Sequence, residues 1–224
     1  MRRNRSIVIS YMNLRTLIGI LGMLLPIMCY IWCCIYNHNI VLESISMHYY
    51  SNFRDIFVGI LITSSVFLIT YKGYNILDNI ITVVIGISGI GIALFPCDTE
   101  IMIENVNFLM LNNIQTSIIH YLSAGLFFAL LAFNSFYLFT KAKSKIIRNS
   151  RKYYRNIIYR ICGVSILIGL IGVMLTLLLG SRDFRNETHL ILILETVMLI
   201  AFGISWLVKG GVIIKDKKLT TAST

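Results

Sequence analysis

Six long apolar segments dominate the sequence and restrict what the chain can fold into. They cover residues 16–36, 56–71, 80–97, 114–140, 157–179 and 189–208. Each is close to the roughly 20 residues that an α-helix needs to cross a hydrocarbon core of about 30 Å. With 57% hydrophobic and 13% charged residues, the chain is too apolar for an ordinary soluble domain. We therefore predict an all-α, polytopic membrane protein, a bundle of six transmembrane helices.

No stretch between the apolar segments is long enough for a second folded domain. The predicted organisation is a cytoplasmic N-terminal segment (1–15), a transmembrane domain (16–208) and a cytoplasmic tail (209–224). The first apolar segment follows basic residues, as in a signal peptide, but it is too long and lacks a small-x-small cleavage site. We interpret it as a retained first span.

The basic residues are divided unequally between the two sides of the predicted spans. Seventeen of the 20 Lys and Arg residues share one side: Arg2, Arg3, Arg5, Arg15, Lys72, Lys141, Lys143, Lys145, Arg148, Arg151, Lys152, Arg155, Arg160, Lys209, Lys215, Lys217 and Lys218. Short loops rich in Lys and Arg stay in the cytoplasm, so we expect both termini there, in a multi-pass protein of the cell membrane, for a bacterium the inner membrane. The net charge of +10 then reflects topology, and we expect membrane lipids rather than nucleic acid as partners.

Polar residues of interest gather on the opposite, outer side. All four histidines fall there, and His120 lies just inside the fourth span. Glu195 lies six residues into the last span, where an acid is costly in lipid and normally faces the bundle interior. The helical period places Glu195 on one face with Phe202 and Trp206, which predicts that this stripe points inward. A contact between His120 and Glu195 is one interpretation; two separately satisfied buried side chains are the other.

The segment 44–59 concentrates hydroxyl, imidazole, aromatic and charged side chains where the second span begins. Its candidate ligand-binding residues are Ser46, His48, Tyr50, Arg54 and Asp55. Asp55 also suits the N-terminus of a helix, where an acid interacts favourably with the helix dipole.

Small residues and cysteines predict packing rather than chemistry. Gly86 and Gly89, Gly125 with Ala129, and Gly163 with Gly169 sit at spacings that let membrane helices approach closely. The five cysteines show no CxxC spacing, so buried free thiols are the default interpretation. We expect no metal site and no cofactor.

The segment 44–59, together with 71–74, 93–96, 120–124 and 205–210, resembles a family of uncharacterised bacterial six-span membrane proteins. The first motif of that family reads S-I-S-x-Y-Y-H-T-x-x-R-D-x-F-V-G, and nearly the whole chain is covered. The layout is more distantly similar to six-span proteins of the Frag, DRAM and Sfk type, which implies lipid handling or membrane trafficking.

Three functions fit these residues. The first is binding or sensing of a lipid or hydrophobic small molecule in an outward-facing polar pocket formed by Ser46, Tyr50, Asp55, His120 and Glu195. The second is a membrane-embedded, metal-dependent hydrolase, although the sequence contains no compact spacing such as H-E-x-x-H. The third is a small transporter, for which internal repeats are the usual sign and none is found between the two halves. Whether the protein is an enzyme stays open at this point.

Overall fold

A computed structural model describes residues 11–36, 41–73, 75–97, 112–141 and 150–214, and this part of the chain is all-helical. Its elements are α1 (Tyr11–Tyr36), the 3₁₀ helix η1 (Ser46–Tyr50), α2 (Arg54–Thr70), α3 (Ile76–Leu94), α4 (Asn113–Phe133), the π-helix η2 (Asn134–Leu138), α5 (Arg151–Leu179), α6 (Arg182–Thr188) and α7 (Leu190–Lys209). The predicted all-α class is confirmed.

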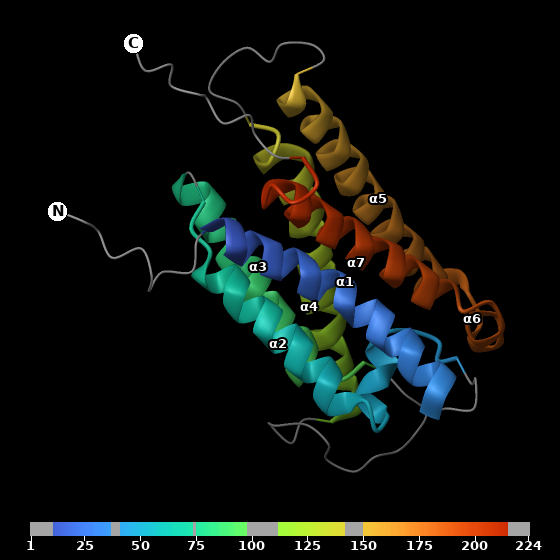
Figure 1. Cartoon of the computed structure of the whole chain (residues 1–224). Helices are drawn as coiled ribbons and strands as arrows, with labels where there is room; N and C mark the ends of the chain where they lie inside the picture. Colours follow the sequence, from blue (N-terminus) through green and yellow to red (C-terminus); the bar gives the residue numbers. More distant parts are fainter. Residues whose placement is uncertain (1–10, 37–40, 74, 98–111, 142–149, 215–224) are drawn as a thin grey trace, which may run out of the picture.

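The long helices form a closed ring. Each long helix packs against the next one in the order α1, α2, α3, α4, α5 and α7, and α7 packs against α1 (Figure 1). The start of α1 lies beside the end of α7, since a Cβ added to Gly210 would lie 3.2 Å from the Thr16 nitrogen. We call this the terminal end of the bundle, and the opposite end, which holds η1 and α6, the α6 end.

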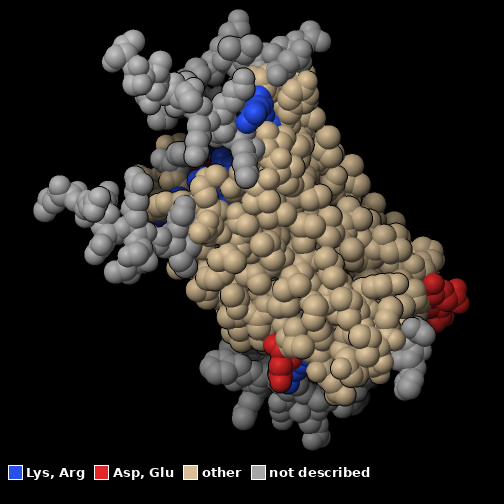
Figure 2. All heavy atoms as spheres, in the orientation of Figure 1, with Lys and Arg blue, Asp and Glu red and all other residues tan. Residues whose placement is uncertain are grey.

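Five of the described helices are long and apolar enough to cross a membrane: α1, α3, α4 with η2, α5 and α7. The sixth member of the ring, α2, has 17 residues. Large apolar side chains cover the outside; Leu178 and Leu179, for example, are 73% and 80% exposed. Figure 2 shows a face without charged side chains between one end, where Lys and Arg lie, and the opposite end, where Asp and Glu lie. The fold is therefore that of a multi-pass membrane protein.

Two helices begin before the predicted apolar segments, at positions where a side chain caps the first turn. The helix α5 begins at Arg151, six residues before the predicted span, because the Ser150 hydroxyl accepts the Tyr153 N–H at 3.2 Å. A capping box between Asn112 and Gln115 starts α4. The short helices η1 and α6 were not expected from the sequence.

The end of α4 winds into one π turn, in which the Phe139 N–H bonds to the Asn134 carbonyl at 2.9 Å. Asn134, Ser135 and Leu138 of this turn are buried, and the Ser135 hydroxyl lies 3.0 Å from that of Ser205 on α7. The apolar segment 114–140 had predicted an uninterrupted α-helix.

Close helix contacts occur at some of the predicted glycines and not at others. A Cβ on Gly86 of α3 would lie 2.6 Å from the Ser65 carbonyl oxygen of α2, so this glycine is required by packing. Gly125, in contrast, has no atom within 4 Å of an added Cβ, so its interpretation as a packing residue is wrong. The pair Gly19 and Gly203, which the sequence did not single out, brings α1 and α7 together.

Candidate functional site

The helices α4 and α5 touch at one end and separate at the other. Towards the terminal end, Gly163 of α5 fits so closely that a Cβ there would lie 3.0 Å from the Ala132 carbonyl oxygen. Towards the α6 end, α5 packs on α7 instead, with Gly169 against Met198 and Gly172 against Leu194. A cavity of about 530 Å³ lies at the α6 end, bordered by both helices and by α6 and α7.

The cavity has an apolar wall and a polar end. Its apolar wall includes Phe128 of α4, Leu170, Val173 and Leu177 of α5, and Met198 of α7. Its charged residues are Glu43, Arg182, Arg185 and Glu195. Ser46 and His120 complete the polar part. This distribution suits a molecule with an apolar body and a polar head.

The segment 43–46, at the polar end of the cavity, is held to the corner between α6 and α7 by hydrogen bonds of Glu43. The Leu192 N–H, one of the first-turn donors that a helix leaves without an internal acceptor, bonds to the Glu43 carbonyl at 3.0 Å. The Glu43 carboxylate in turn accepts Arg185 Nε at 2.7 Å. The chain enters α7 through His189, whose left-handed backbone (φ 49°, ψ 28°) makes the corner between α6 and α7.

Glu195 holds the start of η1. Its Oε2 accepts the Ile45 N–H at 2.6 Å, and its Oε1 accepts the Ser46 hydroxyl at 3.4 Å. Hydrogen bonds to an ionised acceptor are roughly twice as strong as neutral ones, so a carboxylate here would be a firm anchor for the turn. The predicted inward stripe is confirmed further along α7, where Phe202 and Trp206 are buried.

His120 reaches the same cavity from α4. Its Nδ1 lies 2.8 Å from the Phe95 carbonyl oxygen, and because a carbonyl only accepts, Nδ1 carries the hydrogen. A neutral imidazole with that tautomer has a lone pair on Nε2. The side chain is 3% exposed. Three predicted candidates, Ser46, His120 and Glu195, therefore line one cavity.

His48, in the middle of η1, is buried and does not line the cavity. Its Nδ1 donates to the Ile45 carbonyl at 3.1 Å, which leaves Nε2 to accept the Cys33 thiol at 3.6 Å. Burial lowers the pKa of His48 below its ordinary value, which favours the neutral ring. The rings of Trp32 and Phe53 pack on it at 5.5 and 5.8 Å. We assign His48 to the support of η1.

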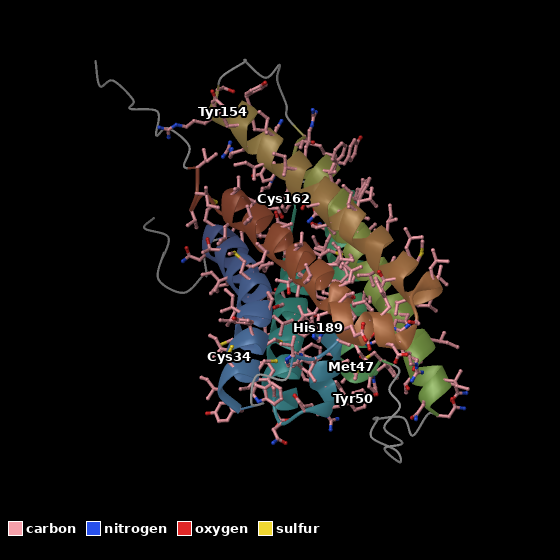
Figure 3. All side chains as sticks on the ribbon, turned by 90° about the vertical axis from the view of Figure 1, so that its right-hand side faces the viewer. Cys34, Met47, Tyr50, Tyr154, Cys162 and His189 are labelled. Carbon is pink, nitrogen blue, oxygen red and sulfur yellow. The ribbon has the colours of Figure 1, made fainter. Side chains whose placement is uncertain are left out.

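The remaining candidates lie outside the cavity lining. The Tyr50 hydroxyl donates to the Cys97 carbonyl at 2.7 Å and so connects η1 to the end of α3. The Arg54 guanidinium donates to the Tyr49 hydroxyl at 2.7 Å. Asp55 is exposed in the first turn of α2, apart from His120 and Glu195. Figure 3 shows Met47 and Tyr50 at the α6 end with His189, and Tyr154 at the other end.

Sequence reasoning missed Glu43, Arg185 and the role of Gly125. The available signal was the opposite charges of Glu43 and Arg185 in two segments predicted on the same side. His38 lies outside the described residues. All four buried cysteines and the exposed Cys34 are free thiols, so Cys34 departs from the expectation of burial.

No protein-family model, curated protein or solved structure matches the chain. Within the described ranges, no group of three His, Cys, Asp or Glu side chains is placed to hold one metal ion. The geometry of the cavity is thus the basis for a functional proposal.

Proposed function

We propose that this chain is a six-span membrane protein with cytoplasmic termini that binds a lipid or another amphiphile in the cavity at its α6 end. The division of basic residues supports the orientation, with the terminal end in the cytoplasm. The 17 residues of α2 rise about 26 Å at 1.5 Å per residue, near the thickness of a hydrocarbon core. Its place in the ring between α1 and α3 supports a sixth span.

The single observation that carries the ligand proposal is the separation of α4 from α5 around a cavity with one polar end. The volume of about 530 Å³ lies within the usual range for small-molecule sites. The apolar tail would contact Leu170, Val173 and Leu177, and the head would reach Ser46, His120 and Glu195.

The polar residues also suggest the class of head group. Two lining residues are acidic and two are basic, so their formal charges cancel. The His120 Nε2 and the Glu195 carboxylate are acceptors, which favours a ligand that brings hydroxyl or ammonium donors. We therefore favour an uncharged or zwitterionic amphiphile over one with net charge.

Lipid analysis of two matched glycine variants tests this function. A leucine at Gly125 should fill the cavity, since an added Cβ there meets nothing within 4 Å. Gly59 of α2 has the same open surroundings but is exposed and does not line the cavity, so Gly59→Leu is the control. Lipids that co-purify in detergent would be measured per mole of protein by mass spectrometry.

We expect wild type and Gly59→Leu to carry the same amphiphile and Gly125→Leu to lose most of it. Unfolding temperatures of the three proteins should stay close, since neither substitution creates a clash. Equal retention of the same lipid species by all three proteins would contradict binding in this cavity.

A further inference from the structure

The cavity runs lengthwise between α4 and α5, which are neighbours in the ring. Its lining includes Tyr121, Gly125 and Phe128 of α4 and Leu170, Met174 and Leu177 of α5. In each set the second and third residues follow the first by four and seven positions, so each set lies on one helix face. Seven residues rise about 10 Å along a helix. The cavity is therefore a cleft between two adjacent helices.

The cleft has exposed edges and a buried floor. Leu122 of α4 and Met174 of α5 line it, although their side chains are 69% and 53% exposed. Phe128 and Met198 also line it, and they are only 8% and 1% exposed. The lining thus passes from the outside of the bundle to its interior, and the cleft opens between Leu122 and Met174 on the side of the bundle.

The outer surface next to this opening is apolar. Ile118 and Leu126, one turn before and after Leu122, are exposed on α4. Leu175 and Leu178 are exposed beside Met174 on α5. Exposed apolar surface of this kind is suited to contact with a membrane. The opening of the cleft therefore faces acyl chains, whereas the charged lining residues lie in α6, α7 and the segment before η1.

We infer that the ligand is a bilayer lipid, which enters the cleft sideways from the leaflet at the α6 end. This inference rests on the function proposed above. A lipid that enters between Leu122 and Met174 keeps its chains out of water during entry. The open side also lets a second acyl chain stay in the bilayer while the first lies along the cleft. The alternative is a single-chain, water-soluble amphiphile that enters at the charged end.

Photolabelling of the full-length protein in phosphatidylcholine vesicles tests the inference. One probe is phosphatidylcholine with a diazirine on one acyl chain, and the other is lysophosphatidylcholine with the same diazirine chain. Mass spectrometry would measure the label on Phe128 and Met198, because these buried floor residues are out of reach of lipid on the outer surface.

Two variants narrow the opening of the cleft. Met174→Trp and Leu122→Trp each enlarge a side chain at one edge, so one variant remains if the other does not fold. Leu178→Trp is the matched control, because Leu178 is exposed one turn beyond Met174 and does not line the cleft.

We expect the phosphatidylcholine probe to label the floor residues equally in wild type and Leu178→Trp. Met174→Trp and Leu122→Trp should each lose most of this label. Floor labelling in both edge variants equal to that of the control would overturn entry through the cleft.

The two probes separate failure of this inference from failure of the proposed function. Floor labelling by lysophosphatidylcholine but not by phosphatidylcholine would overturn the inference and leave amphiphile binding in the cavity intact. Absence of floor labelling by both probes in wild type would contradict the proposed function, and the inference with it.

Discussion

The backbone N–H of Ile45 donates to Glu195 Oε2 at 2.6 Å, although the two residues lie 150 positions apart. This bond places the entrance of η1 against α7 and brings Ser46 and Glu195 to one cavity. The polar end of the cavity thus depends on one acidic side chain inside an apolar helix.

Glu195→Ala should destabilise the protein, because it leaves the buried Ile45 N–H without its acceptor. An unsatisfied donor costs about 1–3 kcal/mol. Glu195→Gln should lose less, since the amide oxygen still accepts a hydrogen bond. The measurement is thermal unfolding in detergent, with the exposed Glu187→Ala as control. An unfolding temperature for Glu195→Ala equal to that of the control would count against the anchoring role.

The Glu43–Arg185 ion pair should contribute to the docking of the polar end. Its side chains are 20% and 15% exposed, so we expect a coupling of about 0.5–1 kcal/mol after solvent screening. A double-mutant cycle with Glu43→Gln and Arg185→Gln measures it through thermal unfolding. Hydrogen exchange at residues 41–50 should rise in both single variants. Strictly additive losses of stability would show that the two side chains act independently.

Acid should destabilise the fold through His48. Its pKa is lowered in the folded state, so the unfolded chain binds the proton more readily. Stability is unaffected at neutral pH and decreases as the pH falls below about 6.5, the pKa of a free imidazole. His48→Asn keeps a donor for the Ile45 carbonyl but does not titrate. Its unfolding temperature should fall less between pH 7 and pH 5 than that of wild type; parallel curves would contradict this role of His48.

Gly163→Leu should disrupt the contact between α4 and α5 at the terminal end. A Cβ there would lie 2.7 Å from the Phe136 Cβ and 2.9 Å from its backbone nitrogen. Overpacking of this kind costs about 1–3 kcal/mol. Thermal unfolding in detergent measures the loss, with Gly59→Leu as the control that meets nothing. A Gly163→Leu protein as stable as the control would show that the two helices can separate without cost.

The apolar segments predicted the long helices because burial in lipid requires internal hydrogen bonds and about 20 apolar residues, both of which are local properties. The helical period also predicted the buried face of α7 with Phe202 and Trp206. Local sequence patterns were therefore sufficient to predict features that depend only on whether a side chain faces lipid or the core of the bundle.

The cavity could not be predicted from local sequence patterns, because it is formed by tertiary contacts between the helices. Gly125 has the same chemistry as Gly163, yet one borders an opening and the other a helix contact. Asp55 and Glu195 are both acids near the α6 end, but the first turn of α2 leaves Asp55 exposed. The segment 43–46 reaches Glu195 only because α7 supplies bonding groups to it. The different surroundings of these residues depend on where the helices separate, and local sequence patterns do not predict that.

The π turn at Asn134–Leu138 follows directly on α4, which ends at Phe133. One extra residue in a turn rotates everything beyond it by about 100° relative to a regular helix. The part before the turn directs His120 and Phe128 towards the cavity, while the turn itself directs Ser135 towards Ser205. Because the turn lies beyond the α4 residues that line the cavity, a substitution in the turn can alter the contact with α7 and leave the cavity wall unchanged, in evolution or in engineering.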